Sequence, residues 1–375
     1  MVWSRQIYGE AILRGPARVA PRKEKPLRSA LKVAAVAMAG ALALAACGSS
    51  STVTPGASGG STGPSKSTIK VGMAYDIGGR GDKSFNDSAA AGLDKAVTDF
   101  GITKNELSAV PDETEGQREA RLTLLATGGY NPVIAIGFNY ADAVKAVSAK
   151  FPQTNFAIID DSSNLQPNVA NLVFAANQGS YLAGVLAASA SKTGTVGFIG
   201  GVNVKLLQSF QVGFDAGAKA TKPGIKVLDQ YLTQPPDFKG FNAPDKGQTV
   251  AKGMYDQGAD IIFAAAGGSG LGVFKAAKAG GKLAIGVDSD QYLSASADLQ
   301  PVILSSALKR VDSAVYAFIK SCVDGAPFTG VKKFDLTNDG VGYSTSNPAI
   351  APYKDAIEKA VAGIKDGSIK VPDVQ

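Results

Sequence analysis

The sequence predicts an α/β protein with two similar lobes, each a parallel sheet flanked by helices. From residue 69 onward, short apolar runs alternate with segments of helical periodicity, which is the pattern of repeated strand–helix–strand units. The pattern restarts near residue 175, and a length of 375 residues suits two lobes better than one small domain. The 44 glycines fit the many tight turns that this alternation requires.

Short apolar runs mark the expected strands, which are Ile69–Tyr75, Val133–Ile136, Phe156–Ile159, Val196–Ile199, Ile225–Leu228, Ile261–Phe263, Leu283–Val287 and Val302–Leu304. Because helical segments separate most of these runs, the sheets should be parallel and covered on both faces. We assign residues 68–174 and about 306–327 to the first lobe. Residues 175–305 and about 328–375 are assigned to the second lobe.

Two helices with an early phenylalanine indicate that the lobes are repeats of one unit. Ser84 and Asp87 have the S-x-x-D spacing of a capping box, and Phe85 begins the helical periodicity that follows. A second helix is expected from near Val204, with Phe210 on its apolar face. In both units the helix follows a strand and a glycine-bearing turn. The carboxyl ends of the strands should therefore face a shared cleft, where ligands of α/β sheets bind.

Residues 1–46 have the features of a secretory signal peptide. A basic stretch precedes the apolar run Val33–Ala46, which is too short to span a bilayer. The run ends in LAACG, which resembles a bacterial lipobox, where cleavage leaves Cys47 as the lipidated first residue; an ordinary signal peptide with a chance cysteine is the alternative. Residues 47–67 are rich in Gly, Ser, Thr and Pro and should form a flexible tether. We expect a protein held by this lipid anchor on the extracytoplasmic face of the cell membrane.

Charge and composition exclude several classes of function. Eight of the 38 basic and two of the 32 acidic residues lie in residues 1–46, which leaves 30 of each and a formally neutral body. A nucleic-acid-binding body would keep a basic excess. The sequence contains no histidine, so no catalytic residue, metal or cofactor is expected. Cys322 lies in an apolar helical stretch, where a core position is expected.

Carboxylates stand directly after three expected strands, at Asp76, Asp160 and Asp288. A carboxylate at a cleft edge accepts hydrogen bonds from the hydroxyl or N–H groups of a neutral polar ligand, although turn formation alone is the alternative for each. Phe85 and Phe210 would face each other across the cleft and close on a flat ligand; core packing is the alternative for each ring.

Two further polar side chains fit such a site. Asn86, next to Phe85, can both donate to and accept from the edge of a heteroaromatic ring. Lys309 can add a cationic donor, with an exposed surface lysine as the alternative. The glycine-rich stretches GGRGDKS and GGSGLG miss the phosphate-binding and dinucleotide-binding spacings and are expected to be tight turns.

The stretch VGMAYDIGGRGDKSFNDSAAAGLDKA resembles the basic membrane protein family of substrate-binding lipoproteins, which includes purine-nucleoside receptors of ABC importers. Further matches follow in the same order, and they are NPVIAIGF, FAIID, NQGSYLAGVLAA, GFIGGVNVKLLQSFQVGFDAGAKA, AAGGSGLGVFKAA, IGVDSDQ and SSALKRVDSAVY. The resemblance implies a type I periplasmic-binding-protein-like fold, a nucleoside ligand and an ABC permease in the membrane as partner.

The resemblance also implies which residues contact the ligand, namely Asp76, Phe85, Asn86, Asp160, Phe210, Gly268, Asp288 and Lys309. Asp161 follows directly after Asp160, so the register of that match stays open. Gln178 stands where many relatives have an acid, a difference we expect to be structural. The segment TQPPDFKGFNAPDKG lengthens the approach to Gly268, and it should shape the rim of the cleft and bear on the identity of the ligand.

Other functions remain open at this level. A sensor of the same fold would pass ligand occupancy to a membrane partner, and a nucleoside hydrolase would use the clustered aspartates. A transcription regulator would need an N-terminal DNA-binding helix pair, and the signal peptide and tether occupy that place.

Overall fold

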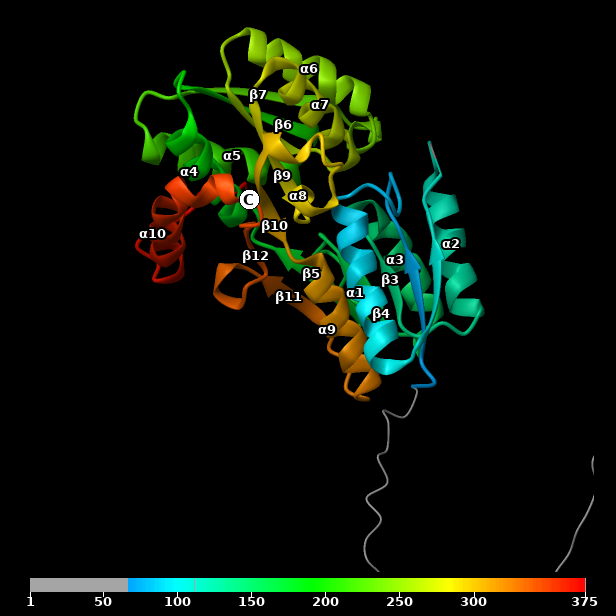
Figure 1. Ribbon diagram of the computed structural model, residues 1–375. Helices are drawn as coiled ribbons and strands as arrows, with labels where there is room; N and C mark the ends of the chain where they lie inside the picture. The colour runs from blue at the N-terminus through cyan, green and yellow to red at the C-terminus, as the bar shows by residue number, and fades with distance from the viewer. Residues whose placement is uncertain (1–66, 111, 375) are drawn as a thin grey trace, which may run out of the picture. The chain divides into compact units, whose positions relative to one another are not determined.

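The computed structural model describes residues 67–110 and 112–374, which form two six-stranded sheets covered by helices (Figure 1). This confirms the predicted α/β fold with two lobes. The expected signal peptide, Cys47 and residues 47–66 of the expected tether lie outside the described residues.

The first lobe is built on an all-parallel sheet with the strand order β11-β5-β4-β3-β1-β2. Its strands are β1 (Lys70–Ala74), β2 (Thr103–Leu107), β3 (Val133–Ala135), β4 (Phe156–Ile159), β5 (Val169–Phe174) and β11 (Gly330–Phe334). Its helices are α1 (Phe85–Phe100), α2 (Glu115–Thr127), α3 (Ala141–Lys150) and α9 (Val311–Val323). Helices α1 and α9 lie side by side and cover one face of the sheet, while α2 and α3 cover the other (Figure 1).

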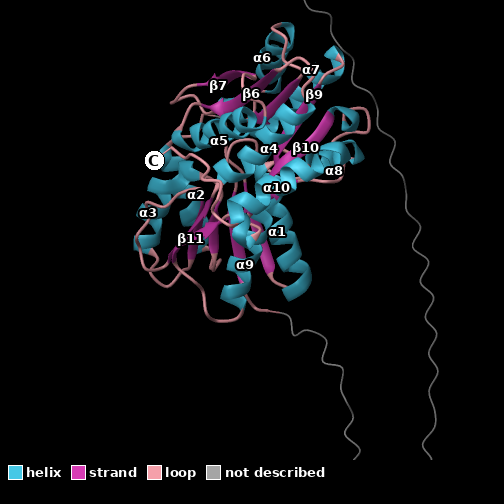
Figure 2. Ribbon diagram, turned by 90° about the vertical axis from the view of Figure 1, so that its left-hand side faces the viewer, coloured by secondary structure: helices cyan, strands magenta, loops and turns pink. Residues whose placement is uncertain are grey.

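The second lobe has the strand order β12-β10-β9-β8-β6-β7, with β12 antiparallel to β10 and the other pairs parallel. Its strands are β6 (Thr195–Val202), β7 (Lys226–Thr233), β8 (Ile261–Ala265), β9 (Leu283–Asp288), β10 (Ile303–Lys309) and β12 (Val341–Tyr343). Its helices are α4 (Ala176–Ala190), α5 (Lys205–Thr221), α6 (Pro244–Asp256), α7 (Gly270–Gly280), α8 (Gln291–Ser294) and α10 (Lys354–Lys365). Helices α4, α5 and α10 cover one face of this sheet, and α6 and α7 cover the other (Figure 2). Apolar side chains are buried beneath both groups of helices.

Close packing of α4 against α5 fixes the helix that carries Phe210. A methyl group at Gly184 would overlap the carbonyl oxygen of Phe214, so only glycine lets the two backbones approach this closely. Ser180 on α4 donates a hydrogen bond to the carbonyl of Phe210. The position of Phe210 is therefore set by backbone contacts as well as by side-chain packing.

The lobe boundaries in the last quarter of the chain differ from the expected ones. Residues 306–327 were expected in the first lobe, yet β10 extends to Lys309 within the second sheet, and the expected strand Val302–Leu304 covers only its start. Residues 328–375 were expected in the second lobe, yet β11 pairs with β5 in the first sheet. The reason is that β11, GVKKF, is a mostly exposed edge strand with no apolar run to reveal it.

Three more strands were not expected from the sequence. β2 (TKNEL) lies at the edge of the first sheet and is mostly polar, and β12 has only three residues. β5 is an apolar run, VANLVF, that sequence analysis did not assign.

The predicted capping box at the start of α1 is wrong. The Ser84 side chain makes no capping hydrogen bond. Instead, the Asp82 carboxylate accepts hydrogen bonds from the backbone N–H groups of Ser84, Asn86 and Asp87. The hydroxyl of Ser84 is used elsewhere, in a contact with the opposite lobe, so Asp82 satisfies the free N–H groups of the first turn.

Candidate ligand-binding site

A cavity lies between the lobes at the carboxyl ends of the strands; the empty space between its walls, together with its open mouth, is about 550 Å³. Seven of the eight expected ligand-contacting residues line it, and they are Asp76, Phe85, Asn86, Asp160, Phe210, Asp288 and Lys309. The eighth, Gly268, lies in a neighbouring groove, while Gly267 lines the cavity.

Lys309 and Asp160 form a buried ion pair across the cleft. Lys309 is the last residue of β10 in the second lobe, and Asp160 follows β4 in the first lobe. Their side chains are only 4% and 3% exposed, so Lys309 is not a surface lysine. The second carboxylate oxygen of Asp160 is buried and accepts no hydrogen bond. Burial raises the pKa of Asp160, while the ammonium of Lys309 acts in the opposite direction.

The two expected aromatic rings share this cavity. The ammonium nitrogen of Lys309 lies 4.7 Å from the ring centroid of Phe85 and 5.9 Å from that of Phe210. It also lies 5.2 Å from the Phe174 centroid. Phe210 packs in addition against Phe263, with the centroids 6.4 Å apart, so this ring contributes to the core as well as to the cavity wall. A flat ligand in the cavity would have aromatic carbon within reach from both lobes.

Asp288 ends β9 and connects the second lobe to the first turn of α1. The Ser84 hydroxyl donates to its carboxylate over 2.6 Å, and the Ser289 hydroxyl donates to the Ser84 carbonyl over 2.8 Å. The Gln291 amide adds a 3.0 Å bond to the Lys83 carbonyl. Burial raises the pKa of Asp288 to about 6.

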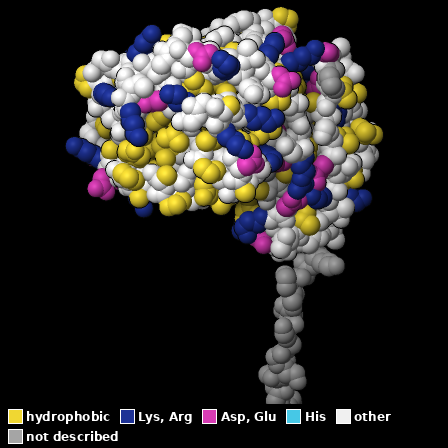
Figure 3. Space-filling view, turned by 45° about the horizontal axis from the view of Figure 1, so that its top comes forward, with side chains coloured by type: hydrophobic (Ala, Val, Ile, Leu, Met, Phe, Trp, Pro, Cys, Tyr) yellow, Lys and Arg dark blue, Asp and Glu magenta, His cyan; other side chains and the backbone are white. Residues whose placement is uncertain are grey.

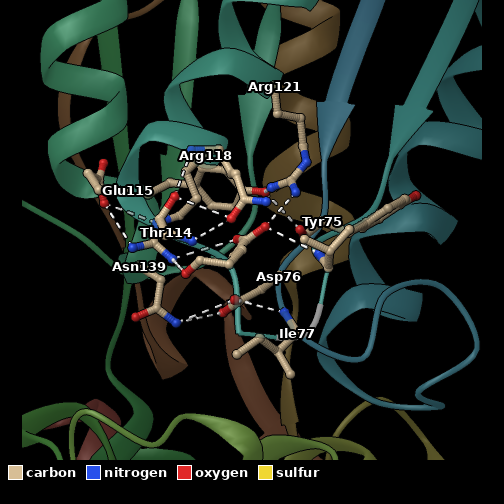
Figure 4. Close-up of polar contacts among 12 residues, drawn as sticks. Tyr75, Asp76, Ile77, Thr114, Glu115, Arg118, Arg121 and Asn139 are labelled. Carbon is tan, nitrogen blue, oxygen red and sulfur yellow. Dashed lines mark hydrogen bonds and ion pairs between the residues drawn. The ribbon is translucent and has the colours of Figure 1, made fainter.

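Asp76 occupies the equivalent strand end in the first lobe, and Figure 4 shows its surroundings. Its carboxylate accepts a 2.8 Å bond from the backbone N–H of Ile77 and longer bonds, 3.4 and 3.5 Å, from the amide of Asn139. A side chain at Gly137, which has a φ of 104°, would collide with the Asp76 carboxylate. Burial raises the pKa of Asp76 to about 6.

Asn86 has local partners for both ends of its amide. Its oxygen accepts from the backbone N–H of Asp76 over 3.0 Å, and its nitrogen donates to Asp82 and to the carbonyl of Ile77. Asn86 therefore holds the loop between β1 and α1 in shape, in addition to lining the cavity.

A second layer of polar contacts supports the end of β1 (Figure 4). The Tyr140 hydroxyl donates to the Tyr75 carbonyl over 2.9 Å, and Arg121 bonds to both the Tyr140 hydroxyl and Glu113. Arg118 pairs with Glu115 over 2.9 Å. This network fixes the residue that precedes Asp76.

Several cavity residues were not expected from the sequence, namely Ile77, Asp82, Phe138, Leu206, Leu207 and Phe241. Phe138 had a weaker signal of the same kind, because it lies three residues after the end of β3, near the carboxyl end of a strand as the three aspartates do. Phe241 lies in the long segment before α6, where only the three-dimensional contacts show its position.

Within residues 67–110 and 112–374, no group of three or more His, Cys, Asp or Glu side chains is placed to hold a metal ion. No helix in the described part of the chain is both long and apolar enough to cross a bilayer. Basic and acidic side chains lie interspersed on the face drawn in Figure 3. Cys322 is buried, and burial raises the pKa of its thiol to about 12.

Comparison with known proteins agrees with this architecture. A family model described as ABC transporter substrate-binding protein, PnrA-like, matches residues 69–375. The ABC transporter nucleoside-binding protein BmpA of Lactococcus lactis is 35% identical over 362 residues, which cover 91% of this chain and 98% of the relative. Basic membrane protein D of Borreliella burgdorferi is 34% identical over 317 residues, which cover 82% and 89%.

A solved structure of an ABC transporter solute-binding protein from Aeropyrum pernix shares the fold. It has a TM-score of 0.71 at 24% sequence identity and covers 81% of this chain and 94% of its own. Two lobes around a cavity, together with the family match and the L. lactis relative, define the class as the substrate-binding proteins of ABC transporters. Within that class, the chain belongs to the Bmp family of PnrA-like substrate-binding proteins, which confirms the family resemblance found in the sequence.

Proposed function

We propose that this protein is an extracytoplasmic lipoprotein that binds a purine nucleoside in the interlobe cavity and delivers it to the permease of an ABC importer. In this proposal Cys47 carries the lipid anchor, and residues 47–67 tether the two-lobed body to the membrane. The L. lactis relative, which matches almost the full length of this chain, is named as a nucleoside-binding protein and supports the ligand class.

The observation that carries the proposal is the pairing of aromatic rings and carboxylates around one cavity. Phe85 and Phe210 come from opposite lobes and can stack on the two faces of a base. The buried oxygen of Asp160 that accepts no hydrogen bond is suited to a ribose hydroxyl. Asp76 from the first lobe and Asp288 from the second offer two more acceptors in the same cavity.

The charge balance of the cavity favours a nucleoside over a nucleotide. Four carboxylates line the cavity, and its single lysine, Lys309, is already paired with Asp160. A phosphate group would meet uncompensated negative charge, whereas the hydroxyl groups of a sugar find acceptors.

Capture and delivery follow from closure of the lobes. Ser84 and Asp288, and Lys83 and Gln291, join the lobes by hydrogen bonds beside the cavity. A ligand held between the lobes stabilises this closed arrangement because its affinity for the closed form exceeds its affinity for the open form. The permease would then recognise the closed protein. No covalent chemistry is needed, so we expect the ligand to be released unchanged.

The proposal is tested by thermal unfolding of the purified protein with a panel of nucleosides, nucleobases and free ribose. A purine nucleoside at 100 times its Kd should stabilise the folded state by about 2.7 kcal/mol. Mass spectrometry of small molecules that co-purify, and of the ligand after long incubation, distinguishes binding from hydrolysis. The proposal fails if no solute of the panel raises the unfolding temperature.

The anchor is tested separately by metabolic labelling with radioactive palmitate. The wild-type protein should take up label and fractionate with membranes, and the Cys47→Ser variant should do neither. Equal labelling of the two proteins would show that Cys47 is not the lipidated residue.

A further inference from the structure

The connection between β7 and α6 contacts both lobes beside the cavity. We call residues 234–243 the strap; the strap contains a short 3₁₀ turn, Lys239–Phe241. We infer that the strap is part of the binding site: Phe241 forms one wall of the cavity, and contact with the first lobe slows release of the ligand. This inference rests on the proposed nucleoside-binding function.

The strap is firmly attached to the second lobe. The Thr233 hydroxyl donates to the Asp237 carbonyl over 2.6 Å. The Ser269 hydroxyl, which is fully buried, donates to the Gly240 carbonyl over 2.7 Å and accepts from the N–H of Ala243 over 2.7 Å. These bonds connect the strap to the end of β7 and to the turn after β8, so it should move with the second lobe as one body.

Phe241 is held against the end of β6 and faces the cavity. A methyl group at Gly201 would lie 2.6 Å from the Phe241 ring, and a methyl at Gly240 would overlap the Gly201 carbonyl. Glycine at both positions lets the strap lie directly on the strand end. The ring of Phe241 therefore has a fixed place in the cavity wall.

The strap also reaches the first lobe. The ring of Phe238 meets Phe138 edge to face, with centroids 6.0 Å apart and planes at 64°. Lys239 pairs with Asp112 over 2.8 Å. Because the two side chains of the ion pair are 55% and 71% exposed, that pair contributes little, and the aromatic contact is the stronger link.

These contacts connect ligand retention to closure. Phe138 lines the cavity from the first lobe, and Phe238 packs on it from the strap of the second lobe. Opening the lobes must separate the two rings, and a ligand can leave only when the lobes open. Loss of the contact should therefore speed release, and loss of the Phe241 ring should weaken binding itself.

The test is stopped-flow dissociation of inosine, guanosine or adenosine, whichever binds the wild-type protein. Phe238→Ala should raise the dissociation rate about threefold to tenfold, the range expected for loss of one aromatic pair. Lys239→Ala should change it by less than about twofold. Phe328→Ala is the matched control: Phe328 makes an edge-to-face contact with Phe318 at 5.4 Å, outside the cavity, and its loss should leave the dissociation rate unchanged.

A dissociation rate of Phe238→Ala within twofold of the wild type would overturn the inference while leaving nucleoside binding intact. If no nucleoside binds the wild type, the proposed function fails instead. The strap contact is then judged without ligand, by a double-mutant cycle of Phe138→Ala and Phe238→Ala in thermal unfolding. A measurable coupling between the two substitutions supports the contact, and strictly additive effects overturn it.

Discussion

Replacing Lys309 by methionine should open the cleft. The substitution keeps an unbranched apolar side chain of nearly the same length but removes the ammonium that pairs with Asp160. Both side chains are almost fully buried, so the carboxylate of Asp160 would remain in a low-dielectric site without a partner.

The structure sets the size of the effect. Removing one member of a buried ion pair costs about 3–5 kcal/mol. Because the pair joins opposite lobes, opening the cleft hydrates Asp160 and relieves this cost without unfolding either lobe. At about 1.4 kcal/mol per tenfold change, the ratio of closed to open molecules should fall roughly 100-fold to 4,000-fold.

Small-angle X-ray scattering measures the opening as an increase in the radius of gyration at pH 7. The double variant Lys309→Met with Asp160→Asn removes both charges, and asparagine tolerates the left-handed backbone at this position, where φ is 66°. The double variant should return toward the wild-type radius. Lys320→Met is the matched control, because the Lys320–Asp324 pair is about half exposed and is expected to contribute less than about 1 kcal/mol.

The sign of the pH dependence gives a second check. Burial raises the pKa of Asp160, and loss of the Lys309 ammonium should raise this pKa further. The closed form of Lys309→Met is therefore destabilised most at pH values at which the Asp160 carboxyl is ionised. Acidification protonates this carboxyl and should close the cleft again. If Lys309→Met has the wild-type radius and stability at pH 7, the reasoning on the buried pair is refuted.

Three further predictions concern the cavity and its edge. Phe210→Ala should weaken nucleoside binding by about 1–3 kcal/mol because one stacking face is lost. Calorimetry measures this change in Kd, and an unchanged Kd would show that Phe210 does not contact the ligand. Burial raises the pKa of Asp76 and of Asp288 to about 6, so both carboxyls become neutral as pH falls through 6. Nucleoside affinity should then fall by up to about tenfold per pH unit for each carboxylate. The Asp288→Asn variant should show a weaker pH dependence of affinity. The same raised pKa values mean that these two groups stabilise the fold below about pH 4 and lose that contribution as pH rises through 6, an opposite trend visible in ligand-free unfolding. Asp82→Ala should destabilise the protein by about 0.5–2 kcal/mol because the N-terminal cap of α1 is lost, whereas Ser84→Ala should keep this cap. Unfolding followed by far-UV circular dichroism measures the difference. Equal curves for Asp82→Ala and the wild type would refute the cap assignment.

Local sequence patterns were sufficient for the class of fold and for much of the site. The alternation of apolar runs and helical segments reflects backbone periodicity, which acts within a few residues, so most of the buried strands could be placed from the sequence; the apolar strand β5 was missed. Asp76, Asp160 and Asp288 could be found because parallel strands bring their carboxyl ends to one edge of each sheet. The internal repeat likewise placed Phe85 and Phe210 at one cavity.

Edge strands and side-chain partners depended on the tertiary structure. β11 carries no apolar run, and its sheet is decided by pairing with β5, about 160 residues earlier in the chain. Ser84 stands at a position where its sequence context predicts a helix cap. In the structure its hydroxyl instead donates a hydrogen bond to Asp288, 204 residues further along the chain. From the sequence, Lys309 could lie either at the cleft or on the surface. In the structure Lys309 lies at the cleft, because it forms a buried ion pair with Asp160 of the opposite lobe.

Thus the sequence alone determined the two-lobed α/β plan, the strand-end carboxylates, the pair of aromatic rings and the family. Only the tertiary structure decided the partner of Lys309, the cap of α1, the sheet of β11 and the contact between the strap and the first lobe. The physical reason is the range of the interactions. Periodicity and turn chemistry act between neighbours along the chain, whereas burial, ion pairing and edge pairing depend on segments that meet only after the chain has folded.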